Sequence, residues 1–195
     1  MMFTKQLANG FEIREVEEDT FWPLWEKYAY GIFTDNSLDF MWREHISSLE
    51  KENLKTLGKN MGSPFKIRLG VFKGDEFAGW SFGDQQSSDV YYMRNSAIRP
   101  EFRRQGLYSE LLKTNIELLS QKGFQKIYSR HTTTNNAVII PKLKAGFIIT
   151  SMELDDMFGS LVHLSYFTNP LRRKVMEFRT GNLRPDEELK NVLKL

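Results

Sequence analysis

The stretch from Ile98 to Leu112 places two arginines, a glutamine and a glycine directly before an apolar pattern with helical spacing. Backbone N–H groups in the first turn of a helix have no intrahelical partner, and the peptide dipoles add positive charge there. Arg103 and Arg104 add charged donors suited to phosphate oxygens, and Gly106 lets a ligand approach the backbone closely. The stretch therefore predicts a pyrophosphate site, with a solvated basic cap before a core helix as the alternative.

A second segment favours the phosphate site. Residues Asn135–Phe147 contain an asparagine, an apolar helical turn and a final Lys-x-Gly-Phe. Arg103 and Gly106 fit the pattern Arg/Gln-x-x-Gly-x-Gly/Ala. Together, in this order, the two segments resemble the two signatures of the GNAT acyltransferases. The resemblance extends in element order over about 11–168, and its specific motifs lie within 96–147.

The resemblance implies an α/β fold with a mixed, mainly antiparallel sheet that is splayed at its centre and carries helices on both faces. It also implies that acetyl-CoA, the co-substrate, binds between two central parallel strands and gives its acetyl group directly to a primary amine. The pyrophosphate would lie on the N–H groups of residues 104–108, the pantetheine arm would pair with the strand near Ser96 and Ile98, and Asn135 would hold the other side. The implied cofactor-binding residues are Ser96, Ile98, Arg103, Arg104, Gln105, Gly106, Leu107, Tyr108 and Asn135.

Several positions depart from the family pattern. Tyr108 stands where glycine or alanine is preferred, and the tyrosine that many members use as general acid is replaced by Lys142, beside Pro141. We expect Lys142 to be solvated, with a pKa near about 10.4, and therefore not to be the acid. Lys142→Met should then keep most of the turnover. The family's base positions fall at Arg130 and Tyr92, so the usual acid and base are missing.

Two residues are candidates to replace the missing groups. Tyr92 shares a strand face with Arg94, and His131 lies near the end of the next strand, where the opening should be. We predict Tyr92 and His131 as the catalytic residues, with a structural role as the alternative for His131. Six aromatic residues of the first helices could line the acceptor side, although core packing explains most of them better: Trp22, Trp25, Tyr28, Tyr30, Phe33 and Trp42.

Composition narrows the function classes. The chain of 195 residues has 41% hydrophobic content. Its 27 basic and 25 acidic residues leave a net charge of +2, which is too small to indicate a protein that binds nucleic acid. Zero cysteines and three scattered histidines argue against a metal site. Without an apolar run long enough to span a membrane, we expect a cytoplasmic protein that does not bind membranes. A non-catalytic acyl-CoA sensor remains the alternative to an enzyme, and a nucleotide-phosphate enzyme is a weaker one.

The elements that must position these residues form one predicted domain, 1–195, with a core at about 11–168 and a helical tail at 169–195. We expect its partners to be a small-molecule or peptide amine and a second copy of the chain in a homodimer. Apolar periodicity and turn residues predict strands at 11–16, 66–72, 76–82, 89–98, 124–132, 147–154 and 161–168. The same signals predict one helix that begins after Asp19 and a second that runs from about Asp39 to Leu57. A third starts at Leu107 and ends before Gly123. A fourth runs from Asn135 to about Ala145, with a kink or early stop at Pro141.

Overall fold

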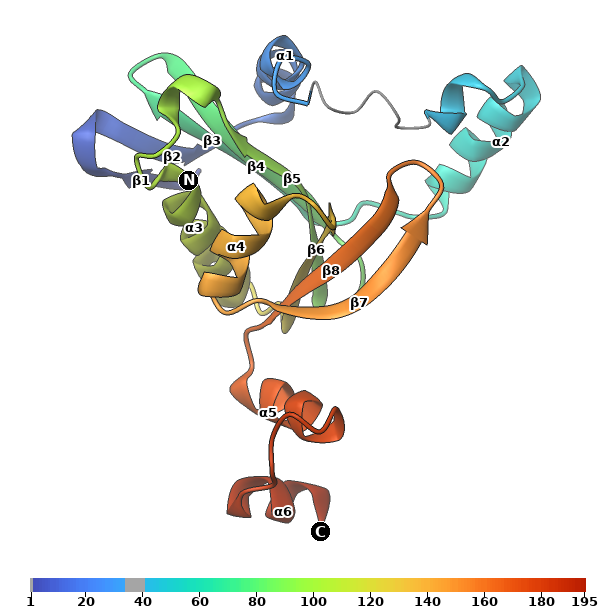
Figure 1. The fold of residues 1–195 in the computed structure, drawn as a ribbon. Helices are drawn as coiled ribbons and strands as arrows, with labels where there is room; N and C mark the ends of the chain where they lie inside the picture. The colour runs from blue at the N-terminus through green and yellow to red at the C-terminus, as the bar shows by residue number, and fades with distance from the viewer. Residues whose placement is uncertain (1, 34–40) are drawn as a thin grey trace.

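A single eight-stranded sheet forms the centre of the computed structural model, which describes residues 2–33 and 41–195 (Figure 1). The strand order is β1-β2-β3-β4-β5-β6-β8-β7. All neighbouring strands pair antiparallel except β5 and β6, which are parallel. The strands are β1 (Thr4–Gln6), β2 (Phe11–Glu15), β3 (Lys66–Lys73), β4 (Glu76–Gln85), β5 (Val90–Ile98), β6 (Lys126–Thr132), β7 (Ile148–Asp155) and β8 (Gly159–Phe167). The predicted mixed, mainly antiparallel sheet is confirmed.

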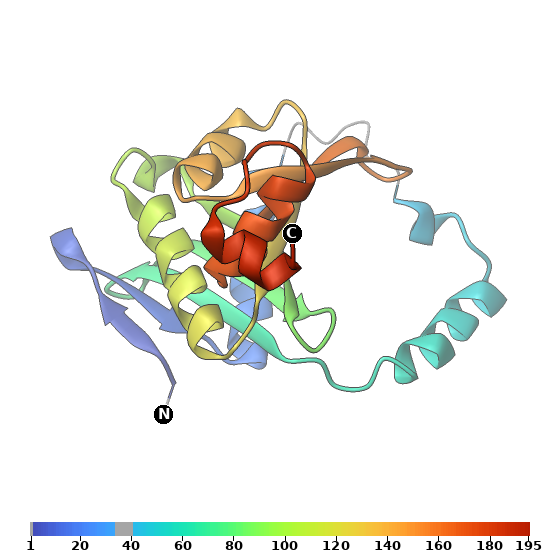
Figure 2. The ribbon, with the colours of Figure 1, turned by 90° about the horizontal axis from the view of Figure 1, so that it is seen from below.

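Helices cover both faces of this sheet, as predicted. Figure 1 shows α3 and α4 together on one face and α1 on the other, while α5 and α6 follow β8 as a tail. In both views α2 stands apart from the sheet (Figures 1 and 2), and none of its residues is buried. The helices are α1 (Glu18–Ala29), α2 (Ser48–Lys59), α3 (Leu107–Gln121), α4 (Asn136–Lys144), α5 (Pro170–Arg179) and α6 (Glu187–Leu193).

The parallel pair β5–β6 splits open part of the way along. Its register runs only from Val90↔Lys126 to Tyr92↔Tyr128, although β5 continues to Ile98. On its other side, β5 pairs with β4 as far as Ile98. A β-bulge in this pair leaves Arg94 without an opposite residue in β4. Beyond Tyr92, the edge of β5 that faces β6 is therefore not paired with that strand. This is the splay expected at the centre of the sheet.

Two hydrophobic clusters hold the helices to the sheet. The larger cluster joins α3 to the strands through leucines at helical spacing, among them Leu107, Leu111 and Leu119. The smaller cluster joins Phe21 of α1 to Trp80 and neighbouring aromatic rings of β3 and β4. Each such buried side chain contributes about 1.5–3 kcal/mol relative to exposure. Successive side chains of each strand alternate between the two faces of the sheet, so neighbouring residues of a strand point to opposite faces.

The aromatic residues expected near the acceptor side divide between packing and exposure. Four of them pack against the smaller cluster, so core packing is the better explanation for those positions: Trp22, Trp25, Tyr28 and Phe33. Tyr30 is 83% exposed, and Trp42 lies in a short 3₁₀ turn, Trp42–Glu44. Tyr30 is therefore open to other contacts, whereas Trp42 is half-buried and has the Arg43 guanidinium carbon 5.2 Å from its ring centroid.

Several elements differ from the prediction. Helix α1 begins at Glu18, slightly before the predicted start. The predicted helix from Asp39 begins outside the described residues, and α2 starts only at Ser48, because Ser47 and Glu50 form a capping box there. Helix α4 continues through Pro141 to its end, so the expected kink does not shorten it. The three-residue strand β1 was not predicted, since its pattern is too short to recognise.

Two properties of the described residues bear on function. None of the helices in 2–33 and 41–195 is long and apolar enough to cross a lipid bilayer. Within the same residues, no group of three or more His, Asp or Glu side chains is arranged to hold a metal ion.

Candidate active site

The turn between β5 and α3 has the geometry of an anion site. Arg104 and Gly106 both adopt left-handed φ values, 61° and 75°, and Gly106 is the N-cap of α3. A Cβ added to Gly106 would meet no described atom within 4 Å, so its missing side chain faces open space. Gly106 has no side chain that could cap the first N–H groups of α3, so these groups remain available to a ligand. The predicted phosphate site thus has an accessible backbone.

The side chains at this turn have separate roles. Arg103 donates from Nε to the Ile98 carbonyl oxygen at 3.0 Å, which ties the loop to the end of β5. Arg104 and Gln105 are exposed. Leu107 is buried in the larger cluster, so only its backbone can serve a ligand. Of the two arginines, Arg104 is therefore the freer to contact a phosphate.

Ser96 and Tyr108 bring the splayed strand and the first turn of α3 together. Their hydroxyl oxygens lie 3.3 Å apart. Burial raises the pKa of Tyr108 to about 12, so this hydroxyl stays protonated. Across the opening, Asn135 lies between β6 and α4. It occupies the N-cap position of α4, but its side chain makes no capping hydrogen bond. Its amide is therefore not used by the first turn of its own helix.

Lys142 corrects the sequence prediction. The side chain is 0% exposed, where a solvated lysine was expected. Its Nζ donates to Ser129 Oγ at 2.6 Å and lies 4.0 Å from Met93 Sδ and 5.1 Å from the centroid of the Phe147 ring. Burial lowers the pKa of Lys142 to about 7. A signal was present in the sequence, because Lys142 follows the buried Ile139 by three residues and so shares its helix face.

The position of the lysine nitrogen follows from the strand register. Tyr92 and Tyr128 form the last recorded pair of β5 and β6. Met93 and Ser129 are the next residues of the two strands, and both lie against the Lys142 Nζ. The buried amine therefore sits where the two strands separate.

His131 joins this cluster from β6. Its Nε2 lies 2.9 Å from Ser129 Oγ, so the serine hydroxyl is shared between the imidazole and Lys142. Burial and the neighbouring Lys142 charge lower the pKa of His131 to about 3. The imidazole is therefore neutral at pH 7 and too weakly basic to hold a proton taken from a substrate.

Tyr92 lies on the other face of the sheet. Its hydroxyl accepts a hydrogen bond from Arg130 Nε at 3.1 Å, and its ring stacks on Tyr128 with centroids 4.8 Å apart. Arg130 also donates to Glu153 at 2.9 Å and to Asp155 at 3.4 Å. Residues alternate along β6, so Tyr128 and Arg130 face away from Ser129 and His131. The structure does not bring the two predicted catalytic residues together.

The polar network around Tyr92 is internally paired. Hydrogen bonds from His163 and Arg130 hold the pKa of Glu153 below its ordinary value. Arg94, the extra residue of the bulge, forms a bidentate pair with Asp84. The sequence prediction did not find this network, because its members come from five different strands, β4 to β8.

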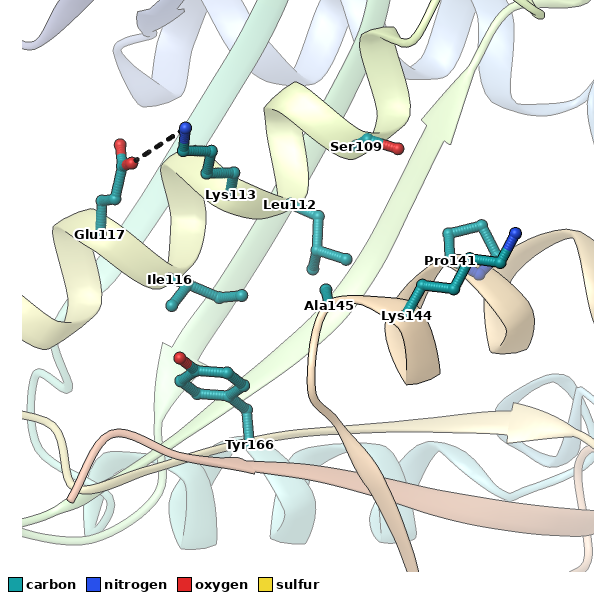
Figure 3. Close-up of a pocket in the computed structure, with 9 residues that line it drawn as sticks. All are labelled: Ser109, Leu112, Lys113, Ile116, Glu117, Pro141, Lys144, Ala145 and Tyr166. Carbon is teal, nitrogen blue, oxygen red and sulfur yellow. Dashed lines mark ion pairs between the residues drawn. The ribbon is translucent and has the colours of Figure 1, made fainter. Parts of the chain in front are cut away.

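A groove of about 360 Å³ lies between α3 and α4 (Figure 3). Leu112, Ile116 and the Tyr166 ring form its apolar wall, and Ser109 from the first turn of α3 lies at one end. The charged residues that line it, Lys113, Glu117 and Lys144, are exposed. Pro141 also lines the groove, whereas its neighbour Lys142 is directed into the sheet instead.

Comparison with known proteins agrees with this geometry. A sequence model described as "Acetyltransferase (GNAT) family" matches residues 18–147, more than half of the chain. No curated protein matched the sequence.

Three solved structures illustrate the likeness of fold. The ribosomal-protein-S18-alanine N-acetyltransferase from Escherichia coli is 20% identical with a TM-score of 0.57, over 82% of this chain and 94% of that one. A GNAT acetyltransferase from Streptococcus pneumoniae is 22% identical with a TM-score of 0.57, over 80% and 99%. A GNAT acetyltransferase from Elizabethkingia anophelis with acetyl-CoA bound is 14% identical with a TM-score of 0.58, over 82% and 99%. By its sequence and its splayed sheet, the chain belongs to the GNAT family of acetyltransferases.

Proposed function

We propose that this protein is an acetyl-CoA-dependent N-acetyltransferase that moves acetyl directly to a primary amine. The observation that carries the proposal is the opening between β5 and β6, with an accessible helix start at its outer end and a buried amine at its inner end. Such an opening offers an extended thioester ligand a strand edge, an anion site and a proton-bearing group in one line.

The cofactor would be held mainly by backbone. Its pyrophosphate would accept from the N–H groups of residues 104–108, with the Arg104 guanidinium beside them and Arg103 fixing the loop. The pantetheine arm would run along β5 past Ile98 and Ser96, and the Asn135 amide would contact it from the side of α4. The acetyl-CoA-bound relative from Elizabethkingia anophelis supports this choice of co-substrate.

The acceptor would approach from the face that carries Tyr92. We propose that the Tyr92 hydroxyl contacts the amine or a water beside it, because that hydroxyl lies next to the end of the β5–β6 ladder. The amine belongs to a small molecule or a peptide. A protein N-terminus merits a place among the test substrates, since the similar enzyme from Escherichia coli is named for ribosomal protein S18. The homodimer and the cytoplasmic location remain predictions.

The chemistry needs little beyond orientation. The amine lone pair attacks the thioester carbonyl carbon, the C–N bond forms, and the C–S electron pair leaves with sulfur. One proton leaves the amine for water and another reaches sulfur. Holding the two reactants in place supplies much of the rate enhancement, and general acid–base groups add about 10²–10⁴-fold.

A coenzyme A release assay over a panel of amines and N-terminal peptides tests the proposal, with cofactor affinity measured in parallel by calorimetry. We expect micromolar-range binding of acetyl-CoA and turnover on one class of amine. Binding without turnover on any amine would favour the non-catalytic sensor. Absence of binding would refute both.

A further inference from the structure

We propose that Lys142 is the catalytic acid that protonates the departing coenzyme A thiolate, and that Ser129 and His131 position and reload it. This inference rests on the proposed function, because it needs a thioester in the β5–β6 opening. It replaces the expectation that this lysine is a bystander at the surface.

The place of the Nζ atom is the first argument. The atom lies against Met93 of β5 and Ser129 of β6, the first residues beyond the last paired ones. A ligand anchored at Gly106 and extended along β5 past Ser96 would reach this point with its far end. That end is where a coenzyme carries its sulfur.

The chemical state of the amine is the second argument. Within 2–33 and 41–195, Lys142 has no carboxylate within ion-pair distance, and its hydrogen-bond partners are the Ser129 hydroxyl and the Met93 sulfur. A buried ammonium without a counter-ion is costly, so a purely structural role gives no reason to keep it. With its pKa lowered to about 7, below an ordinary thiol value of about 8.5, the ammonium gives its proton readily to a thiolate.

The Ser129 hydroxyl offers a route for reloading the lysine. It lies 2.6 Å from Lys142 Nζ and 2.9 Å from His131 Nε2, and His131 is partly exposed whereas the other two residues are buried. After donation, neutral Lys142 accepts the Ser129 proton, Ser129 takes one from His131 Nε2, and the imidazole recovers one from water at Nδ1. Ser129 and His131 are positioning residues in this scheme, because neither touches the thioester.

The step balances. As the C–S bond breaks, its electron pair stays on sulfur, the Nζ–H bond of Lys142 breaks, and an S–H bond forms. The products are the amide, free coenzyme A and a neutral lysine that water reprotonates through Ser129. A competing step is attack by neutral Lys142 on the thioester, which would leave an acetylated lysine and make the residue a nucleophile instead.

The first experiment titrates the thiol of coenzyme A bound to the full-length protein, followed by thiolate absorbance, and needs no acceptor. In the wild type, the thiol and Lys142 titrate as a coupled pair, so thiolate should begin to form below the ordinary thiol value of about 8.5 and the absorbance curve should spread over two apparent pKa values. In Lys142→Met the pKa should return to the free value or above it, while Lys122→Met, an exposed lysine at the end of α3, should behave as the wild type. If coenzyme A binds and the wild type and Lys142→Met titrate alike, this inference is wrong and the proposed function stands.

The second experiment measures turnover on the amine found in the acetyl-transfer assay. Lys142→Met should lower kcat about a hundredfold or more with little change in the KM for acetyl-CoA, and Ser129→Ala should lower it about tenfold. Wild-type kcat should fall as pH rises through about 7, because the protonated lysine is required, and Lys142→Met should lack this limb.

The groups that face Lys142 bear on this pH profile. His131 is the ionisable neighbour from β6, Met93 and the Phe147 ring do not ionise, and α3 presents Lys113 and Glu117 to the groove between α3 and α4. A limb near pH 7 that persists in Lys142→Met would belong to another group and would refute the assignment. Acetylation of Lys142 during turnover, detected by mass spectrometry, would overturn the acid role in favour of the nucleophile.

Discussion

The two faces of β6 treat buried charge in opposite ways. On the face toward α4, Lys142 is fully buried with a serine hydroxyl and a thioether for partners. On the other face, Arg130 donates to Tyr92, Glu153 and Asp155. The paired face can be explained by stability alone. The unpaired face cannot, which is the reason to propose a reactive group there.

The pKa directions express the same contrast. Burial dominates at Lys142 and moves its pKa down toward neutrality. At Arg130 burial acts in the same sense, but the hydrogen bonds to Tyr92 and Glu153 outweigh it and hold the pKa above its ordinary value. A lysine that can lose its proton near pH 7 suits proton transfer, whereas a permanently charged arginine suits positioning.

The largest expected effect tests whether the face toward α3 and α4 carries the cofactor. Gly106→Glu should abolish coenzyme A binding, because a carboxylate would enter the phosphate site. Titration calorimetry measures this loss. Gly123→Glu is a matched control, since Gly123 also has a positive φ, 95°, and open space around a built Cβ, but lies at the far end of α3. Unchanged affinity in Gly106→Glu would remove the anion site from the proposal.

The second prediction concerns the free energy of unfolding and tests the cost of burying the unpaired charge of Lys142. Lys142→Met should increase the free energy of unfolding at pH 7 by about 3–5 kcal/mol, because the shift from 10.5 to about 7 reports the cost of burying the ammonium. Urea unfolding measures the difference. A less stable variant would mean that the Ser129 hydrogen bond outweighs the cost of burial.

The same pair of proteins predicts a pH dependence. The folded wild type releases the Lys142 proton near pH 7, and the unfolded chain keeps it to about pH 10.4, so the unfolded state binds more protons in this window. The free energy of unfolding of the wild type should therefore rise relative to that of Lys142→Met between about pH 7 and 10. Below pH 7, Lys142→Met should be more stable than the wild type by the full difference. A gap that does not change with pH would contradict the burial of a titrating lysine.

A smaller effect tests the acceptor face. Tyr92→Phe keeps the stacked ring and removes the hydroxyl, so turnover should fall by roughly a hundredfold if that hydroxyl transfers a proton, with little change in coenzyme A affinity. Steady-state kinetics with the identified amine measures the loss. Equal rates for the two proteins would dismiss Tyr92 as acid or base and leave the face purely structural.

The smallest expected effect is a loss of stability in Arg130→Met, opposite in sign to the gain expected for Lys142→Met. Arg130→Met should lower the free energy of unfolding by about 1–3 kcal/mol, because it leaves Glu153 and Asp155 without their shared donor. Coenzyme A affinity should not change, since Arg130 faces away from α4. A stabilised Arg130→Met would show that the two faces do not differ in the way proposed here.

The sequence by itself predicted most of the elements and the candidate cofactor side of the site. Helix α3 and its glycine-containing start follow from local periodicity and turn chemistry, and the strands follow from apolar runs between breakers. The candidate anion site at residues 104–108 could therefore be proposed from the sequence, because backbone N–H groups at a helix start need no distant partner. The mixed sheet also followed, since a strand, helix and strand in succession imply one parallel pair.

Only the tertiary structure decided which side chains meet. Lys142 is buried because α4 packs over the point where β5 and β6 part, and Met93, Ser129 and Lys142 come from three separate segments. Tyr92 and His131 fall on opposite faces because strand residues alternate, and a bulge at Arg94 resets the alternation in β5. Residue type alone predicted a solvated lysine, whereas its pKa depends on desolvation, which is set by everything that packs around the nitrogen.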